Sequence, residues 1–113
     1  MVYDTAKQLA GELRSSAEYA EYAEARERAM ENPATRALIG QYNTLQIKAQ
    51  AEVVAGKQDG EALQKLKKIG ELLQFDADAS AYLMAEYRLK RMLGDVYKIL
   101  AEAVDVDLGP LEG

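Results

Sequence analysis

Three glutamates spaced three residues apart are the first side chains in this sequence that could perform chemistry. Glu18, Glu21 and Glu24 would lie near one face of a helix, where their carboxylate oxygens could bind a cation. Metal sites in helical bundles, however, draw ligands from several helices and commonly include histidine, which this chain lacks. A solvated acidic face near a helix N-terminus, stabilised by the helix dipole, is the favoured interpretation. The sequence therefore predicts neither a metal nor a cofactor.

The side chains that usually carry catalysis are missing or lack a partner. The absence of cysteine and histidine excludes a thiolate nucleophile, the commonest general base, a disulfide framework and the usual zinc and iron–sulfur sites. Ser15, Ser16 and Ser80 fall at expected helix starts, and the pattern places no base beside them. We predict a protein that is not an enzyme and has no small-molecule substrate.

Five basic side chains form a candidate partner-binding patch, namely Lys65, Lys67, Lys68, Arg88 and Arg91. The net charge of −5 argues against general binding to nucleic-acid phosphates, although residues 33–75 carry six bases and four acids between two acidic segments. Contact with an acidic protein or with RNA is the functional alternative. Local pairing on solvated helix faces is the favoured interpretation, through the pairs Glu61–Lys65, Glu86–Lys90 and Arg91–Asp95.

Tyr19, Tyr22 and Arg26 form a second candidate surface, because they share a face of the helix expected around them. Tyrosine and arginine are enriched in interface hot spots, so these residues could recognise a partner. Tyrosines also line the boundary of a core with their hydroxyl groups in water, and boundary packing is the favoured interpretation.

Helices must position all of these residues, because helix formers dominate the sequence and no segment alternates as a strand would. Start and stop signals predict five helices, over residues 4–14, 16–30, 33–55, 59–75 and 79–104. The start signals are Asp4, a capping box in residues 15–18, Asn32 before Pro33, Asp59, and the acidic segment 76–78. Gly56 is expected to end the third helix.

Apolar spacing predicts how these helices pack. In the third helix a packing seam recurs at steps of three and four, formed by Leu38, Tyr42, Leu45, Ala49 and Val53. The last helix carries two apolar rows, and one short chain offers little to cover both. We therefore expect a homodimer, with an interface on this helix formed by Tyr82, Leu83, Leu89, Leu93, Val96, Tyr97 and Leu100.

The predicted fold is all-α: an antiparallel bundle of about five helices, two of them long, that dimerises through the long C-terminal helix. The length of 113 residues predicts a single domain, with an irregular tail at residues 105–113. The sequence shows no basic start followed by an apolar run and no long apolar stretch. We therefore expect a cytoplasmic protein without a signal peptide or membrane contact.

Several segments carry a resemblance to a known family. Near the N-terminus these are Tyr3-Asp4-Thr5-Ala6, Leu13-Arg14-Ser15 and Glu18-Tyr19, followed by Ala37-Leu38, Leu45-Gln46 and the break at Ala55-Gly56. Near the C-terminus they are Met84-Ala85-Glu86-Tyr87-Arg88-Leu89 and residues 92–99. The pattern resembles the YlbF/YmcA family, especially its YheA-like branch, over nearly the whole chain. This resemblance implies an oligomeric all-α protein of the bacterial cytoplasm.

The resemblance also implies a regulatory role. Some family members are accessory regulators of RNA processing by the endoribonuclease RNase Y, and so influence competence, sporulation and biofilm formation. YheA-like members have no assigned activity. Members of the regulatory complex hold iron–sulfur clusters through cysteine, so cluster binding does not carry over to this cysteine-free chain.

We expect a non-enzymatic, oligomeric helical adaptor that acts on a protein partner in RNA processing or developmental regulation. Direct contact with nucleic acid is not expected. One alternative is a weak RNA-binding module that uses the five basic residues. Another is a chaperone-like helical grip, which requires an exposed apolar cleft.

Overall fold

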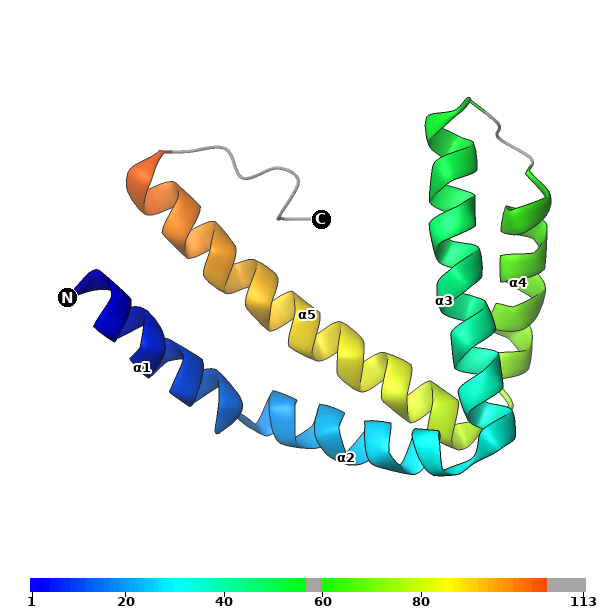
Figure 1. Ribbon diagram of the computed structural model, residues 1–113, viewed down its shortest axis with the longest axis horizontal. Helices are drawn as coiled ribbons and strands as arrows, with labels where there is room; N and C mark the ends of the chain where they lie inside the picture. Colours follow the sequence, from blue (N-terminus) through cyan, green and yellow to red (C-terminus); the bar gives the residue numbers. More distant parts are fainter. Residues whose placement is uncertain (57–59, 106–113) are drawn as a thin grey trace. The chain divides into compact units, whose positions relative to one another are not determined.

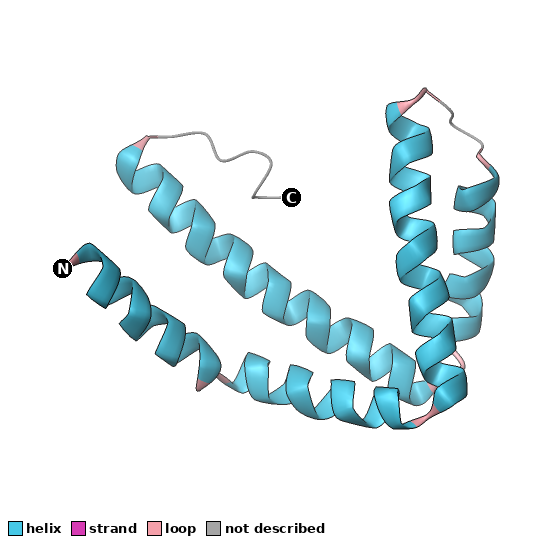
Figure 2. Ribbon diagram, in the orientation of Figure 1, coloured by secondary structure: helices cyan, strands magenta, loops and turns pink. Residues whose placement is uncertain are grey.

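The computed structural model describes residues 1–56 and 60–105, and within these ranges the chain forms helices joined by short turns (Figures 1 and 2). The helices are α1 (Val2–Arg14), α2 (Ala17–Glu31), α3 (Pro33–Val54), α4 (Glu61–Leu73) and α5 (Ala77–Val104). The all-α fold class is confirmed, and α3 and α5 are the long helices, with 22 and 28 residues. None of the described helices is both long and apolar enough to cross a bilayer.

Most helix boundaries follow from local caps that the sequence predicts. Asn32 precedes Pro33, and its side-chain oxygen accepts hydrogen bonds from the backbone N–H groups of Ala34 and Thr35, at 3.0 and 3.4 Å. At the other end of α3, Gly56 adopts a φ of +86°, a left-handed conformation that glycine takes without steric cost. Both predicted ends of α3 are therefore confirmed.

Two predicted helix starts are corrected by the structure. The cap of α2 is Ser16, whose hydroxyl oxygen accepts from the Tyr19 N–H at 3.1 Å, so the capping box predicted for residues 15–18 is out of register by one position. Asp4 does not precede α1 but lies in its first turn, 3.4 Å from the N-terminal ammonium group. The predicted cap at Asp59 lies outside the described residues.

The chain divides into two compact units, and the first contains residues 1–24 and the segment that begins at Met84. In this unit α1 and the start of α2 run antiparallel to the greater part of α5 (Figure 1). No residue of α1 is buried, and its apolar Leu9 and Leu13 are only half-buried. A layer of two helices can cover one side of each helix at most, so apolar residues on the other sides remain in water.

The second unit comprises Ala25–Leu83 and contains the end of α2, all of α3 and α4, and the start of α5. Four apolar residues of α4 recur at steps of three and four on one face: Ala62 and Leu73 are buried, and Leu66 and Ile69 are half-buried. α3 and α4 form an antiparallel hairpin whose seam includes the buried Ala49 (Figure 1).

Small side chains predominate among the buried apolar residues. Over the described part of the chain, the large members of this buried set are Ile39, Leu73 and Tyr82, and the others are alanines. Many larger apolar side chains are exposed, among them Phe75 at 88% and Val54 at 88%. Because burial of apolar surface is the main stabilising force, a single chain leaves much of this stabilisation unused.

Candidate protein-interaction site

A hydrogen bond between residues 41 positions apart joins the two ends of the α3–α4 hairpin. The side chain of Thr35, in the first turn of α3, is fully buried, and its hydroxyl donates to an Asp76 carboxylate oxygen at 2.5 Å. The other carboxylate oxygen caps α5 by accepting from the N–H groups of Asp78 and Ala79, both at 3.1 Å. One carboxylate therefore ties the start of α3 to the start of α5.

The environment of Asp76 stabilises its charged form. The bond from Thr35 is the largest cause that lowers the pKa of this carboxyl below its ordinary value of 3.8, followed by the bond from the Ala79 N–H. Partial burial opposes these effects, and the Asp78 N–H adds a smaller lowering. Asp76 is thus an ionised structural residue at neutral pH. The sequence marked the acidic segment 76–78 as the start signal of a helix expected from Ala79, whereas α5 begins at Ala77, and it gave no sign of the bond between Asp76 and Thr35.

A groove of about 680 Å³ runs along one side of the α3–α4 hairpin. We call it the lysine groove and define it by its lining residues, Ala37, Gly40, Gln41, Thr44, Leu45, Lys48, Lys65, Lys68 and Ile69. The α3 residues recur at alternating intervals of three and one, as one face of a helix does. The groove therefore has a floor of small and apolar residues and a margin that carries lysines from both helices.

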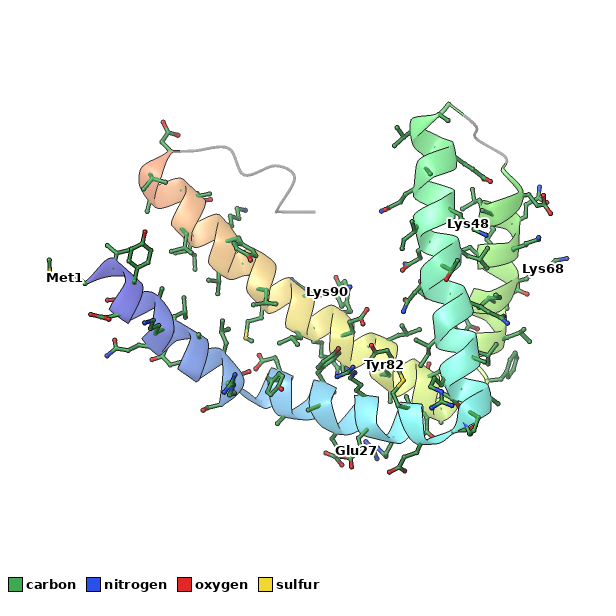
Figure 3. The ribbon with its side chains drawn as sticks, in the orientation of Figure 1. Met1, Glu27, Lys48, Lys68, Tyr82 and Lys90 are labelled. Atoms are coloured by element: carbon green, nitrogen blue, oxygen red, sulfur yellow. The ribbon has the colours of Figure 1, made fainter. Side chains whose placement is uncertain are left out.

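The lysines of this groove differ in their local pairing. Lys65 Nζ lies 3.0 Å from Glu61 on the same helix, and this hydrogen bond, together with the positive charge, lowers the pKa of the Glu61 carboxyl. Lys48 on α3 and Lys68 on α4 are exposed and form no ion pair within the described ranges (Figure 3). These two cations are the ones available to an anionic partner.

The structure brings together some members of the predicted basic patch and separates others. Lys65 and Lys68 line the lysine groove, whereas Lys67 is exposed on α4 and lines neither this groove nor the one on the other side of the hairpin. Arg88 and Arg91 belong to the other compact unit. The sequence did not single out Lys48, because it lies 17 positions before Lys65 in the chain.

The top of the hairpin is closed by a cap that comes from the neighbouring helix. Gly60 precedes α4 and has no side chain to cap it, but Glu52 of α3 accepts a hydrogen bond from the Ala62 N–H at 3.4 Å. A β-carbon placed on Gly60 would lie only 1.6 Å from a carboxylate oxygen of Glu52. Glycine at this position therefore permits the carboxylate to reach the start of α4.

A second groove, of about 490 Å³, lies on the other side of the α3–α4 seam. Its lining contains the exposed Val53 and Val54 with Leu63 and Leu66, and among the described residues it includes no charged side chain. Over the described residues the two sides of the hairpin therefore differ in charge, and the lysine groove is the side that carries cations.

The predicted interface residues of α5 differ in how far they are exposed. Tyr82 is buried within the chain at 6% exposure, and its neighbour Leu83 is half-buried. Further along the helix Leu89, Leu93 and Val96 are half-buried. The most accessible members are Tyr97, at 42% exposure, and Leu100, at 52%.

Two basic residues of α5 in the first unit form ion pairs with nearby glutamates. Arg88 forms an ion pair with Glu21 of α2, and Lys90 pairs with Glu86 at 3.2 Å, as the spacing predicted. Over the residues that the structure describes, Arg91 does not form the predicted ion pair with Asp95. Side chains on a solvated helix face gain little free energy from such pairing.

The glutamates of α2 are not arranged as a metal site in the described chain. No group of three or more metal-ligating side chains is close enough there to hold an ion, and Glu21 instead pairs with Arg88. Tyr19 is 40% exposed and Tyr22 is half-buried, positions typical of the boundary between a core and solvent.

Comparison with known proteins gives a consistent result over nearly the full length. The profile of a family described as control of competence regulator ComK, YlbF/YmcA, matches residues 2–105. The chain is 44% identical over 108 residues to a UPF0342 protein of Symbiobacterium thermophilum, which covers 95% of this chain and 96% of the relative. A UPF0342 protein of Halothermothrix orenii is 33% identical over 108 residues, covering 95% and 92% of the two chains.

Proposed function

The chain belongs to the YlbF/YmcA family, and from this premise we propose that it is a non-enzymatic, oligomeric helical adaptor that regulates a protein partner. The family is described by its control of a regulator of competence, which is a regulatory role and not a catalytic one. The finer proposal is that the partner acts in bacterial RNA processing or developmental regulation in the cytoplasm, as the resemblance to the family implies.

The observation that carries the proposal is the uncovered apolar surface of the first compact unit. On α5, Tyr87 is 65% exposed, Tyr97 is 42% exposed, and Gly94 lies on the same helix face between them. Leu100 and Val104 are 52% and 67% exposed. Large apolar side chains gathered on one helix favour burial against another surface.

A second copy of the chain is the simplest cover for this surface. Within the first unit, α1 and the start of α2 form an antiparallel pair with the greater part of α5 (Figure 1). Two such pairs related by a two-fold axis would make a four-helix bundle, in which the half-buried apolar residues of both chains enter one core. We place Leu89, Leu93, Val96, Tyr97 and Leu100 in that interface, with Leu83 at its edge. Tyr82 is already buried within its own chain, so we expect it to support the interface without contacting the second copy.

Size-exclusion chromatography with light scattering tests the oligomeric part of the proposal. We expect twice the mass of one chain at tens of micromolar, and the mass of one chain for the variant Tyr97→Glu/Leu100→Glu, because each glutamate would lose its hydration in an apolar interface. Lys98→Glu, an exposed neighbour, is the matched control and should remain dimeric. A monomeric mass for the unaltered protein refutes the dimer.

Affinity capture from the native bacterium, read by mass spectrometry, tests the regulatory part. Unaltered protein should recover the same partner reproducibly, and this partner should belong to RNA processing or developmental regulation. Recovery of no protein beyond that seen with an unrelated helical bait would contradict the adaptor role.

A further inference from the structure

We propose that the lysine groove binds an amphipathic helix of a protein partner whose polar flank is acidic. This inference rests on the proposed adaptor function, and it assigns the partner surface to the α3–α4 hairpin. The dimer surface, by contrast, is assigned to α5. Three properties of the groove support the assignment: its length, its floor and its charge.

The length of the groove is sufficient for about three turns of a docked helix. Its α3 residues run from Ala37 to Lys48, which corresponds to about three helical turns, or roughly 16 Å at 1.5 Å per residue. A helix laid into a groove contacts it through residues spaced by three and four, so three turns supply several anchoring side chains. The volume of about 680 Å³ is sufficient for such side chains.

The floor of the groove permits close approach. Ala37, Gly40 and Thr44 follow one another along α3, and Leu45 and Ile69 provide larger apolar surface beside them. An ideal β-carbon on Gly40 would meet no atom within 4 Å, so this glycine is not required by packing inside the chain. Its lack of a side chain leaves room for an apolar side chain of the partner beside α3.

The charge of the groove selects an acidic partner. Lys48 and Lys68 approach the groove from its two helices, and Lys65 adds a third cation that Glu61 already partly compensates. Residues 33–75 carry six bases and four acids, although the whole chain has a net charge of −5. Carboxylates that flank the apolar face of a docked helix would complement this local excess, which favours an acidic helix over a basic one.

An RNA strand fits this groove less well than a helix does. Affinity for nucleic acid depends largely on the number of phosphate contacts, and the groove offers three lysines, of which one is paired. Among the residues that the structure describes, no aromatic side chain lines the groove, so bases would have no ring on which to stack. The apolar floor would instead be covered by apolar side chains.

Peptide titration monitored by NMR tests the proposal. The probes are two stapled helical peptides of about four turns with the same alanine and leucine face, one flanked by glutamates and the other by lysines. We expect the glutamate peptide to shift the amide signals of Ala37–Lys48 and Lys65–Ile69, and the lysine peptide to leave them unchanged. The absence of such shifts with the glutamate peptide up to about 1 mM, the weakest affinity of interest, overturns the proposal.

Matched variants connect this binding to the groove. Lys68→Glu should weaken the glutamate peptide at least roughly fivefold, because a favourable charge contact becomes a repulsive one, whereas Lys67→Glu makes the same charge change outside the groove and should have little effect. Gly40→Leu should abolish binding by filling the groove while preserving the helical signal. Equal weakening by Lys67→Glu and Lys68→Glu, or unchanged binding to Gly40→Leu, would contradict the assigned site.

A short single-stranded RNA added to the same labelled protein separates the two kinds of partner. Shifts at the groove with RNA and none with the glutamate peptide refute the peptide proposal in favour of nucleic acid. Light scattering on the unaltered protein keeps the two proposals distinguishable. An unaltered dimer that fails to bind the glutamate peptide refutes the groove alone, and an unaltered monomer that binds it refutes the α5 dimer alone.

Discussion

Replacing Thr35 with valine tests whether the bond to Asp76 stabilises the base of the hairpin. Valine keeps the shape of the buried side chain and removes the hydroxyl that donates to the Asp76 carboxylate. A hydrogen bond to a charged group contributes about 1.5–3 kcal/mol, and water can replace part of it because Asp76 is only half-buried. We therefore expect Thr35→Val to lower the free energy of unfolding by about 1–2 kcal/mol at pH 7.

The loss of stability should depend on pH in a defined direction. The pKa of Asp76 lies below its ordinary value in the folded protein, so its charged form contributes stability above the unfolded pKa, near 3.8. This contribution is lost as the pH falls through the lower, folded pKa. Because valine removes the largest cause of the lowered pKa, the difference between unaltered protein and variant should narrow below about pH 4.

Urea unfolding followed by circular dichroism at pH 7 and at pH 3 measures both effects. Protein concentration must be held constant, because dimer formation would shift the apparent stability by mass action. Thr35→Ser is the control: it keeps the hydroxyl and loses one methyl group, for about 1 kcal/mol at both pH values. Unchanged stability of Thr35→Val at pH 7, or an equal deficit at both pH values, would refute the reasoning.

Two further predictions concern the ends of the hairpin helices. Glu52→Ala should lower the free energy of unfolding by about 1 kcal/mol, because the Ala62 N–H at the start of α4 loses its acceptor. Urea unfolding measures this loss, and an unchanged free energy of unfolding would show that water replaces the bond fully. Gly56→Ala should cost roughly 1 kcal/mol in the same assay, because φ there is +86°, and a variant as stable as the unaltered protein would argue against this turn.

The features that sequence reasoning predicted are those fixed by nearby residues. Asn32 caps α3 through N–H groups two and three positions away. The start signal predicted in segment 76–78 contains Asp76, which caps α5 in the same manner, although the helix begins at Ala77, two residues before the predicted start. The family is also confirmed, because its segments are distributed over nearly the whole chain. Where the prediction was one residue out, at the cap of α2, two adjacent serines offered the same chemistry and only the backbone distinguishes them.

The features that sequence reasoning missed depend on contacts between distant residues. Thr35 and Asp76 are 41 positions apart, and no periodicity marks a buried hydroxyl that meets a carboxylate. Glu52 caps a helix to which it does not belong, across a turn of the chain. The lysine groove likewise joins Lys48 to Lys68 only after the hairpin closes, so a patch defined by sequence neighbours included Lys67 and omitted Lys48.

Three glycines inside helices give a common test of the two proposed surfaces. Gly40 lies in the lysine groove, Gly94 lies between exposed tyrosines of α5, and Gly70 lines neither groove; a β-carbon on any of them would meet nothing within 4 Å. Glycine within a helix costs about 0.5–1 kcal/mol relative to alanine, so each alanine variant should gain that stability in the Tyr97→Glu/Leu100→Glu background, where association does not contribute.

The variants should differ in their effect on binding. A methyl group weakens a contact only where another backbone or side chain approaches closely, so Gly94→Ala should raise the dimer dissociation constant and Gly40→Ala should weaken the glutamate peptide. Gly70→Ala should change neither, because nothing is proposed to dock there. If all three variants gain stability and none alters dimerisation or peptide affinity, these glycines do not mark surfaces of close approach, and the argument from Gly40 and Gly94 fails even where binding itself is observed.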